Sequence, residues 1–204
     1  MCNGGSQMRG KVPVEQATLQ RDTGLVDAAL RDSAAFAAIV GQFKQALGRY
    51  LRRVLGSHAQ SAEDVLQDAF INAYLNLNDY DRSRPLSPWL YRIAHNEAVS
   101  YLRKRNVEPQ TLGSEDAILI LERQGGGDDP GLAWLRNGTV IEVHQALAKL
   151  EVRYRDVLTL RYLEDKSYDE ISDILELPPG TVATLLSRGL KRLRAPLEPT
   201  WGTT

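Results

Sequence analysis

Acidic and imidazole side chains are the first candidates for chemistry in this sequence. Glu63, Asp64 and Asp68 share one predicted helix. His95 lies on a later helix, so a metal or acid–base site is conceivable. The wider pattern does not support such a site. The three histidines lack ligand-like spacing, the single cysteine (Cys2) allows no internal disulfide or cysteine-rich zinc site, and no phosphate-binding loop or nucleophile–base pair is present. We therefore expect no enzyme, no metal and no cofactor.

A second kind of chemistry is docking through charge. Asp64, Gln67 and Asp68 stand at positions i, i+3 and i+4, which places them on one face of a helix. They can present a small acidic patch to a basic partner. The alternative for Asp64 alone is that it only caps the helix.

A third kind is nucleic-acid binding near the carboxyl end. Ser167-Tyr-Asp-Glu170 matches a capping box, and a Leu-Pro-Pro-Gly turn ends at Gly180 before a last helix over 181–194. Two helices joined in this way have the spacing of a helix-turn-helix, whose second helix enters the major groove. Thr181 and the free N–H groups of the first turn can hold a phosphate. A helical hairpin without DNA explains the spacing alone equally well.

Clusters of basic and aromatic side chains favour nucleic acid over that alternative. Arg188, Lys191, Arg192 and Arg194 follow one another on the last helix, although such a run is often only a solvated face. Trp89, Tyr91 and Arg92 stand beside a loop rich in Asn, Asp, Ser and Pro. Aromatic rings and guanidinium groups can stack on unpaired bases. Trp89 is also a good core residue, and we favour the core for it.

Helical periodicity predicts the elements that hold these residues. Apolar residues recur at three- and four-residue steps over two blocks, without a run long enough to span a membrane. The residues from 35 to 105 carry ten Lys/Arg against six Asp/Glu, and those from 106 to 140 carry two against six. Two helical blocks with basic faces and an acidic linker fit this pattern. The expected helices cover 32–55, 62–77, 87–105, 140–149, 153–163, 167–175 and 181–194.

The order of these motifs resembles one family, the extracytoplasmic-function sigma factors of bacterial RNA polymerase, within the sigma-70 family. Ala62-Glu-Asp-Val-Leu-Gln-Asp-Ala-Phe, Pro88-Trp-Leu-Tyr-Arg-Ile-Ala-His-Asn and Tyr101-Leu-Arg-Lys-Arg look like its region 2. The stretch from Ala146 to Leu163, with Ser167-Tyr-Asp-Glu-Ile and Leu177-Pro-Pro-Gly-Thr-Val, looks like region 4. Both matches stand in the family's order, with the acidic linker between them.

The resemblance implies an all-α protein of two small domains and a set of site residues. It implies a disordered N-terminus at 1–24, region 2 at 25–106, a linker at 107–138, region 4 at 139–196 and a tail at 197–204. The residues implied to bind core polymerase are Asp64, Gln67 and Asp68. The residues implied to bind DNA are Asn78, Asp79, Arg82, Trp89, Arg92, Asn96, Arg103, Lys104, Arg105, Thr181, Val182, Ala183, Thr184, Arg188, Lys191 and Arg192.

The last helix departs from the family pattern. Ala183 and Leu185 stand where the family has polar donors, and Leu190 stands near a usual Arg. One hypothesis is that the helix reads DNA through methyl contacts of Ala183 or Thr184 and through DNA shape. A competing hypothesis is that Leu185 and Leu190 form a protein-docking surface.

Partners follow from the same resemblance. It implies core RNA polymerase, promoter DNA and an anti-sigma protein as partners, with the −10 element read by region 2 and the −35 element by region 4. It also implies a cytoplasmic protein. A stand-alone helix-turn-helix regulator and a sigma-like decoy are the alternatives.

Overall fold

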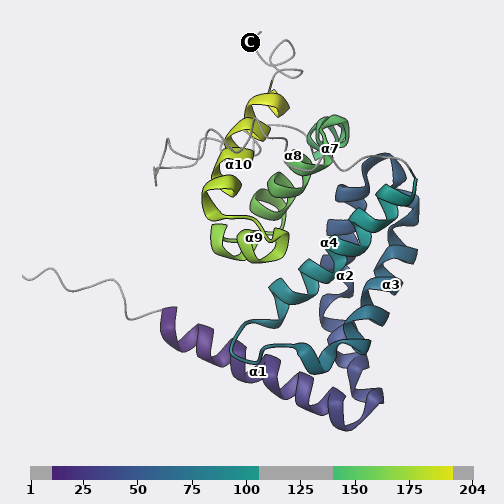
Figure 1. Cartoon of the computed structure of the whole chain (residues 1–204), viewed down its shortest axis with the longest axis vertical. Helices are drawn as coiled ribbons and strands as arrows, with labels where there is room; N and C mark the ends of the chain where they lie inside the picture. Colours follow the sequence, from purple (N-terminus) through teal and green to yellow (C-terminus); the bar gives the residue numbers. More distant parts are fainter. Residues whose placement is uncertain (1–10, 106–139, 195–204) are drawn as a thin grey trace, which may run out of the picture.

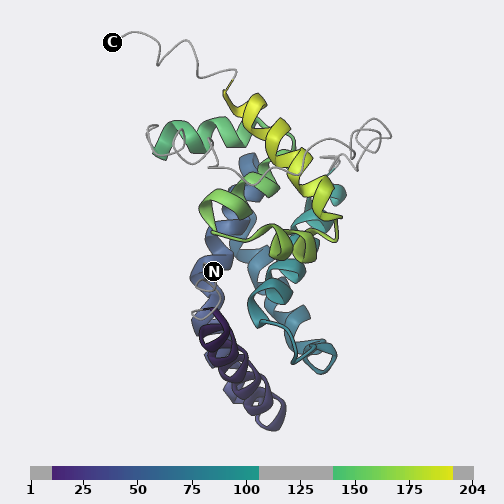
Figure 2. The ribbon, with the colours of Figure 1, turned by 90° about the vertical axis from the view of Figure 1, so that its left-hand side faces the viewer.

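Every regular element is a helix within residues 11–105 and 140–194, which the computed structural model describes. The all-α fold in two helical domains is confirmed. The two groups of helices lie side by side, the second against the upper half of the first (Figures 1 and 2). The first group comprises α1 (Lys11–Arg31), α2 (Phe36–Leu55), α3 (Ala62–Leu75) and α4 (Leu86–Lys104). The second group comprises α7 (Val140–Lys149), α8 (Val152–Leu158), α9 (Tyr168–Leu175) and α10 (Pro179–Arg194).

Short tight turns connect these helices. Three 3-10 helices lie in the first group, and one π-helical turn continues α8 in the second. They are η1 (Ser33–Ala35), η2 (Gly56–Ser61), η3 (Leu77–Asp79) and η4 (Thr159–Leu163). The predicted linker at 107–138, the predicted tail at 197–204 and residues 1–10 lie outside the described residues.

The core of the first group forms where α2, α3 and α4 pack together. The apolar stripe predicted on α2 is buried, with Ile39, Phe43 and Leu47 among its members. Val65 on α3 and Leu90 on α4 meet it from the other side of the bundle. Burial of apolar area of this kind is the main favourable contribution to folding.

Helix α1 corrects the prediction of disorder over 1–24, because the helix begins at Lys11. It runs along the lower end of the bundle (Figure 1). Val26 and Ala29 are buried against the first group. The segment lacks a clear helical period, so local sequence did not reveal the helix. Tertiary packing stabilises α1, as it does most helices of moderate length.

The start of α4 shows what α1 contributes. Helix α4 begins at Leu86, and Ser87, of a residue type that often caps a helix, lies within its first turn. The cap comes instead from Asp22 of α1, whose buried carboxylate accepts a hydrogen bond of 2.8 Å from the backbone N–H of Leu86. Pro88 lies in the first turn, where a missing N–H costs little.

The residue before α3, Ser61, bonds to another helix and does not cap its own. Ser61 precedes α3 but makes no side-chain capping bond. Its hydroxyl accepts instead from the Tyr101 hydroxyl of α4, at 2.7 Å. Ser61 therefore joins the start of α3 to the end of α4.

The second group is held by a predicted cap and a tight turn. Ser167 accepts from the N–H of Glu170, whose carboxylate accepts from the N–H of Ser167, so the capping box is confirmed. Glu176 ends α9 in the left-handed conformation, at φ 55°. Gly189 lets α10 approach α8 closely, because a Cβ there would lie 3.2 Å from the Leu158 side chain.

We predict that Asp22→Ala lowers the free energy of unfolding by about 1–3 kcal/mol, because it leaves the buried N–H of Leu86 without an acceptor. Urea unfolding followed by circular dichroism measures the change. Asp27→Ala is the matched control, since the Asp27–Arg82 pair of α1 is exposed and such pairs contribute about 0–1 kcal/mol. Equal losses for the two variants would contradict the capping role.

Candidate nucleic-acid interface

A small pocket lies where the loop after η3 meets the start of α4. Its volume is about 80 Å³. The half-buried Trp89 ring packs 5.5 Å from the Tyr80 ring, so Trp89 serves both the core and the pocket wall. The pocket is lined by Asp79, Tyr80, Asp81, Arg84, Pro85, Pro88, Trp89, Arg92 and Asp173.

Local hydrogen bonds hold the pocket loop in shape. The Asp81 carboxylate accepts from the Ser83 backbone N–H at 2.9 Å and from its hydroxyl at 2.7 Å. These two bonds lower the pKa of Asp81. The Tyr80 hydroxyl donates to the Arg84 carbonyl, and burial, with the nearby Asp22 and Asp81, raises the pKa of Tyr80 to about 12. The loop is thus ordered before any ligand arrives.

Exposed polar and basic groups extend from this pocket along α4 and around η3. Asn96, Arg103, Lys104 and Arg105 are exposed or nearly so, and Arg105 stacks over Tyr101 at 5.0 Å. Asn78 and Asp79 are exposed on η3, while Arg82 pairs with Asp27 of α1 at 3.0 Å. The structure therefore leaves most of the predicted strand-binding residues of the first domain exposed, on η3 and along α4.

Tyr91 is the exception among the aromatic residues considered from the sequence. It is 3% exposed, and its hydroxyl donates at 2.8 Å to Glu164, which follows η4. Burial makes the largest contribution to raising the pKa of Tyr91, and the neighbouring Glu164 carboxylate raises it further. Tyr91 is therefore a contact between the two domains and is unavailable for stacking on a base in this arrangement.

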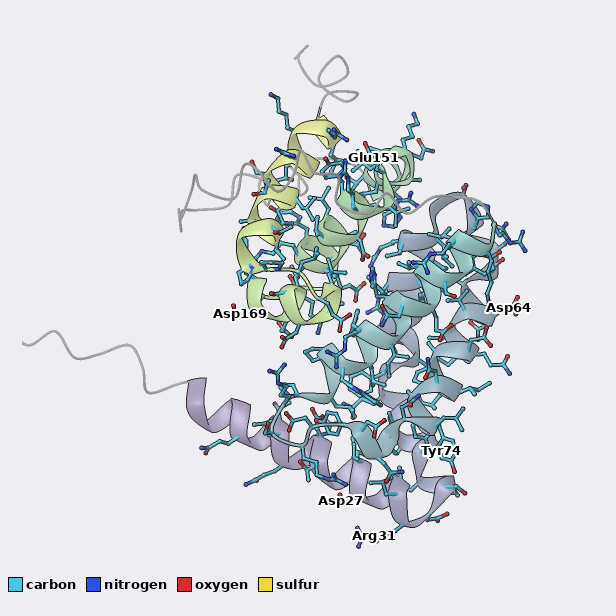
Figure 3. The ribbon with its side chains drawn as sticks, in the orientation of Figure 1. Asp27, Arg31, Asp64, Tyr74, Glu151 and Asp169 are labelled. Carbon is cyan, nitrogen blue, oxygen red and sulfur yellow. The ribbon has the colours of Figure 1, made fainter. Side chains whose placement is uncertain are left out.

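The acidic patch lies on the outer face of α3. Asp64, Gln67 and Asp68 are all exposed, and Figure 3 shows Asp64 on the side away from α8–α10. The same helix continues into exposed apolar residues that sequence reasoning missed: Ile71, 50% exposed, and Leu75, 70% exposed. Ile71 and Leu75 follow Asp68 by three and seven residues, and this helical spacing could have placed them on the same face as the acidic patch.

Tyr74, near the end of the same helix, is a further exposed aromatic residue. Its side chain is 43% exposed and makes a T-shaped contact with the Phe36 ring, at 5.2 Å between the ring centroids. Tyr74 therefore belongs with the exposed apolar end of α3.

The last helix, α10, divides its predicted DNA-binding residues between surface and core. Lys191 and Arg192 are exposed, and Ala183, Thr184 and Arg188 are half-buried. Arg192 pairs with Glu151 and stacks over Tyr154 at 4.3 Å. Thr181 and Val182 are buried, 5% and 0% exposed, so their side chains hold α10 in the domain.

The burial of Leu185 bears on the hypothesis that α10 forms a protein-docking surface. The Leu185 side chain is 2% exposed and packs in the core with Val182 and Leu186. Leu190 is half-buried against the same core. The docking-surface hypothesis is therefore wrong for Leu185, because that side chain lies in the core.

The contact between the two domains centres on a buried carboxylate that sequence reasoning missed. Asp156 of α8 is 2% exposed and accepts from the Tyr50 hydroxyl of α2 at 2.7 Å. Its other oxygen lies 2.6 Å from Nδ1 of His95 on α4. Burial by itself lowers the pKa of His95, but the Asp156 carboxylate outweighs it and raises the value above the ordinary one. For Tyr50, burial and Asp156 both raise the pKa.

A second set of contacts surrounds this carboxylate. Glu164, nearly buried, pairs with Arg53 of α2, and the ammonium of Lys166 lies 2.7 Å from the Ser87 hydroxyl of α4. Arg155 of α8 donates to the Val54 carbonyl at 2.9 Å, passing Gly56 at the end of α2. Gly56 has φ +56°, and a Cβ there would lie 2.0 Å from the Arg155 guanidinium.

Helix α9 completes the contact at the pocket itself. Asp173 lies 3.2 Å from Arg84, and Glu176, at the end of α9, lies 3.9 Å from Arg92. Asp173 also forms part of the pocket wall. Two acidic residues of the second domain therefore face two basic residues of the predicted strand-binding surface.

Neither a metal cluster nor a membrane span is found in the two described ranges. No group of three or more His, Cys, Asp or Glu side chains is placed to hold a metal ion there. No described helix is long and apolar enough to cross a membrane.

Known proteins match both halves of this arrangement. The family model for sigma-70 region 2 matches residues 39–107, and that for sigma-70 region 4 matches 141–193. The chain is 35% identical to the ECF RNA polymerase sigma factor SigW of Bacillus subtilis, over 82% of this chain and 91% of that protein. It is 34% identical to the RNA polymerase sigma-H factor of Pseudomonas aeruginosa, over 89% of this chain and 96% of that one.

Solved structures agree with the sequence comparisons. CnrH in complex with the cytosolic domain of CnrY superposes with a TM-score of 0.62 at 26% identity, covering 88% of this chain and 98% of CnrH. The sigma factor RpoE of Bartonella quintana, bound to the anti-sigma factor NepR, has a TM-score of 0.59 over 81% of this chain and 98% of RpoE. At 24% identity that likeness shows the fold. With both regions matched in order and relatives this similar over most of their length, the chain belongs to the ECF family of RNA polymerase sigma factors.

Proposed function

We propose that this sigma factor binds core RNA polymerase and directs it to promoters, with region 2 reading the −10 element and region 4 the −35 element. One observation carries the proposal above the others. The first domain presents two separate surfaces, the Trp89 pocket with its neighbouring polar and basic groups and, on α3, an acidic and apolar face. A stand-alone regulator has no need of that second face.

The −10 element is bound as single-stranded DNA. Trp89 and Tyr80 offer aromatic surface at the pocket, and Arg92, Asn96 and the basic end of α4 offer charge and hydrogen bonds along a strand. Stacking of a base on an aromatic ring contributes about 1–3 kcal/mol. Capture of unstacked bases in this way favours melted over paired DNA without nucleotide hydrolysis. The protein therefore acts without catalysis of its own.

The −35 element is bound by α10 in the major groove. Ala183 and Thr184 lie in its first turns, where helix-turn-helix proteins meet base edges. Arg188, Lys191 and Arg192 follow toward the phosphate backbone. With Thr181 and Val182 in the core, base readout falls to Ala183 and Thr184. Methyl groups of this kind contact thymine, and DNA shape supplies the remaining specificity.

Two partners and a location complete the proposal. The α3 face binds a basic surface of core polymerase, with Ile71 and Leu75 adding apolar contact beside Asp64, Gln67 and Asp68. An anti-sigma protein binds the free chain; CnrH and RpoE were both solved with a protein partner. The site of action is the bacterial cytoplasm, because that compartment holds the polymerase and the genome.

Transcription in vitro tests the proposal. The purified chain is mixed with bacterial core polymerase and a genomic promoter library, and the 5′ ends of the transcripts are sequenced. Initiation downstream of a shared two-part motif supports the proposal. Stable binding to core without initiation would instead indicate a decoy, and absence of binding to core would exclude a sigma factor.

We predict that Gln67→Arg/Asp68→Arg abolishes binding to core polymerase and initiation together. The double change replaces the centre of the acidic α3 face by two positive charges, which repel a basic partner. Affinity chromatography on immobilised core measures binding. Gln16→Arg/Gln20→Arg is the control, because it adds two arginines at exposed positions of α1. Equal binding by both double variants would contradict docking through α3.

We also predict that Ala183→Lys strengthens promoter binding by the holoenzyme and makes it more sensitive to salt. One new phosphate contact steepens the slope of log K against log [salt] by about 0.9. Fluorescence anisotropy on a promoter duplex from the library, over a series of salt concentrations, measures both quantities. Ala148→Lys on α7 is the control, since it adds the same charge at an exposed position outside α10. The same slope for both variants would place α10 away from the duplex.

A further inference from the structure

Helix α1 holds the loop of the Trp89 pocket at two points. The Asp22 carboxylate, 3% exposed, accepts a hydrogen bond of 2.8 Å from the backbone N–H of Leu86. Asp27, one and a half turns further along α1, pairs with Arg82 at 3.0 Å. Figure 1 shows α1 running past the segment that leads into α4. The pocket loop is therefore attached to a helix that lies earlier in the chain.

The residue held by Asp22 lies in the middle of the pocket sequence. Arg84 and Pro85 precede Leu86, and Pro88 and Trp89 follow it; all four line the pocket. Leu86 itself is the first residue of α4, and its side chain is fully buried. The position of its backbone N–H therefore fixes where the loop ends and how the first turn of α4, which carries Trp89, is oriented.

No neighbouring residue replaces Asp22 as the cap. The first N–H groups of a helix have no partner within the helix and need an outside acceptor. Pro85, which occupies the N-cap position of α4, makes no side-chain capping bond. The start of α4 thus depends on an acceptor from α1. Without it, the Leu86 N–H would be buried without a partner unless the first turn shifted.

Asp22 also lies near the second aromatic residue of the pocket. The Tyr80 ring packs 5.5 Å from the Trp89 ring, and its hydroxyl donates to the Arg84 carbonyl. Burial makes the largest contribution to raising the pKa of Tyr80, and the nearby Asp22 carboxylate raises it further. The hydroxyl therefore stays protonated and remains a donor to Arg84. Asp22 acts on both aromatic walls of the pocket without lining it.

We propose that Asp22 is a positioning residue for recognition of the −10 element. Through the start of α4 it sets the orientation of Trp89 and its neighbours, so α1 determines how well region 2 discriminates among −10 sequences, although no proposed DNA contact lies on α1. This inference rests on the proposed function of the Trp89 pocket.

Discrimination by the holoenzyme tests the inference. One promoter template carries a single-stranded −10 element, with the sequence found in the transcripts of the promoter library, and a second carries a scrambled −10 element. Fluorescence anisotropy gives the affinity for each template, and the ratio of the two affinities measures discrimination. Loss of folded protein lowers both affinities alike and leaves the ratio unchanged. The ratio therefore separates positioning from stability.

We expect Asp22→Ala to lower this ratio by about fivefold, which corresponds to the loss of one weak stacking contact with a base. Asp22→Asn keeps an oxygen acceptor at the same place, so its ratio should stay within about twofold of the native value. Rescue by the amide would identify the hydrogen bond to Leu86 as the cause. If Asp22→Ala keeps the native ratio, or if Asp22→Asn loses as much as Asp22→Ala, the inference is overturned.

The control variant is Ile39→Val, which removes one methyl group from the core side of α2, outside the pocket lining. It destabilises the bundle through lost packing alone. Its ratio should equal that of the native chain. An equal fall in the ratio for Ile39→Val and Asp22→Ala would show that any loss of stability has this effect, and would also overturn the inference.

Hydrogen exchange of the native chain tests the same bond without a variant, should Asp22→Ala fail to fold. The Leu86 amide should exchange slowly in nuclear magnetic resonance spectra, because it is buried and bonded to Asp22. Exchange at the rate of an unstructured peptide would overturn the inference. The native ratio tests the proposed function separately. If the native holoenzyme discriminates but Asp22→Ala discriminates equally well, only the positioning role has failed.

Discussion

The contact between the two regions depends on one buried carboxylate. Asp156 is 2% exposed and sits between Tyr50 and His95, which come from two different helices of region 2. A carboxylate removed from water costs several kcal/mol unless hydrogen bonds and opposite charge replace its hydration. Both are supplied only when region 4 sits in this position. Sliding or rotation of region 4 would leave the charge without partners.

Such a contact specifies a position more than it adds stability. The Coulombic gain of a buried ion pair is largely offset by the desolvation of both members, so the net contribution is small. The penalty for a wrong position of region 4 is large, because the Asp156 carboxylate would then lack the partners that offset its desolvation. A contact of this kind can be well defined and still be exchanged for a stronger partner, such as a polymerase. The surrounding Glu164–Arg53 and Lys166–Ser87 contacts behave in the same way.

The sequence predicted those features whose causes are local, and it missed those whose causes are distant. The capping box at Ser167 depends on residues three apart and was found. The cap on α4 comes from Asp22, 64 residues before Leu86, and no local pattern could reveal it. Asp156 looks like any helical carboxylate until Tyr50, 106 residues away, is placed beside it.

Leu185 shows an avoidable error of a different kind. It lies three residues after Val182 and one before Leu186, and helical periodicity already puts it on the inner face with both. Comparison with the family's usual residues drew attention to its lack of polarity instead. The acidic face of α3 and the pocket residues around Trp89 were found because their spacing is regular or their composition unusual. The exposed Ile71 and Leu75 went unnoticed because apolar residues on a helix are assumed to be buried.

The contact between the two regions also depends on a glycine, Gly56, at the end of α2. Its positive φ ends α2, and the space of its absent side chain is filled by the guanidinium of Arg155, which donates to the Val54 carbonyl. Any side chain at this position would strain the helix end and push Arg155 away from its acceptor. Glycine is therefore required at position 56 for two reasons, the positive φ and the space for Arg155. Substitutions of Gly56 should therefore weaken the contact between the two regions, although no proposed DNA contact involves this residue.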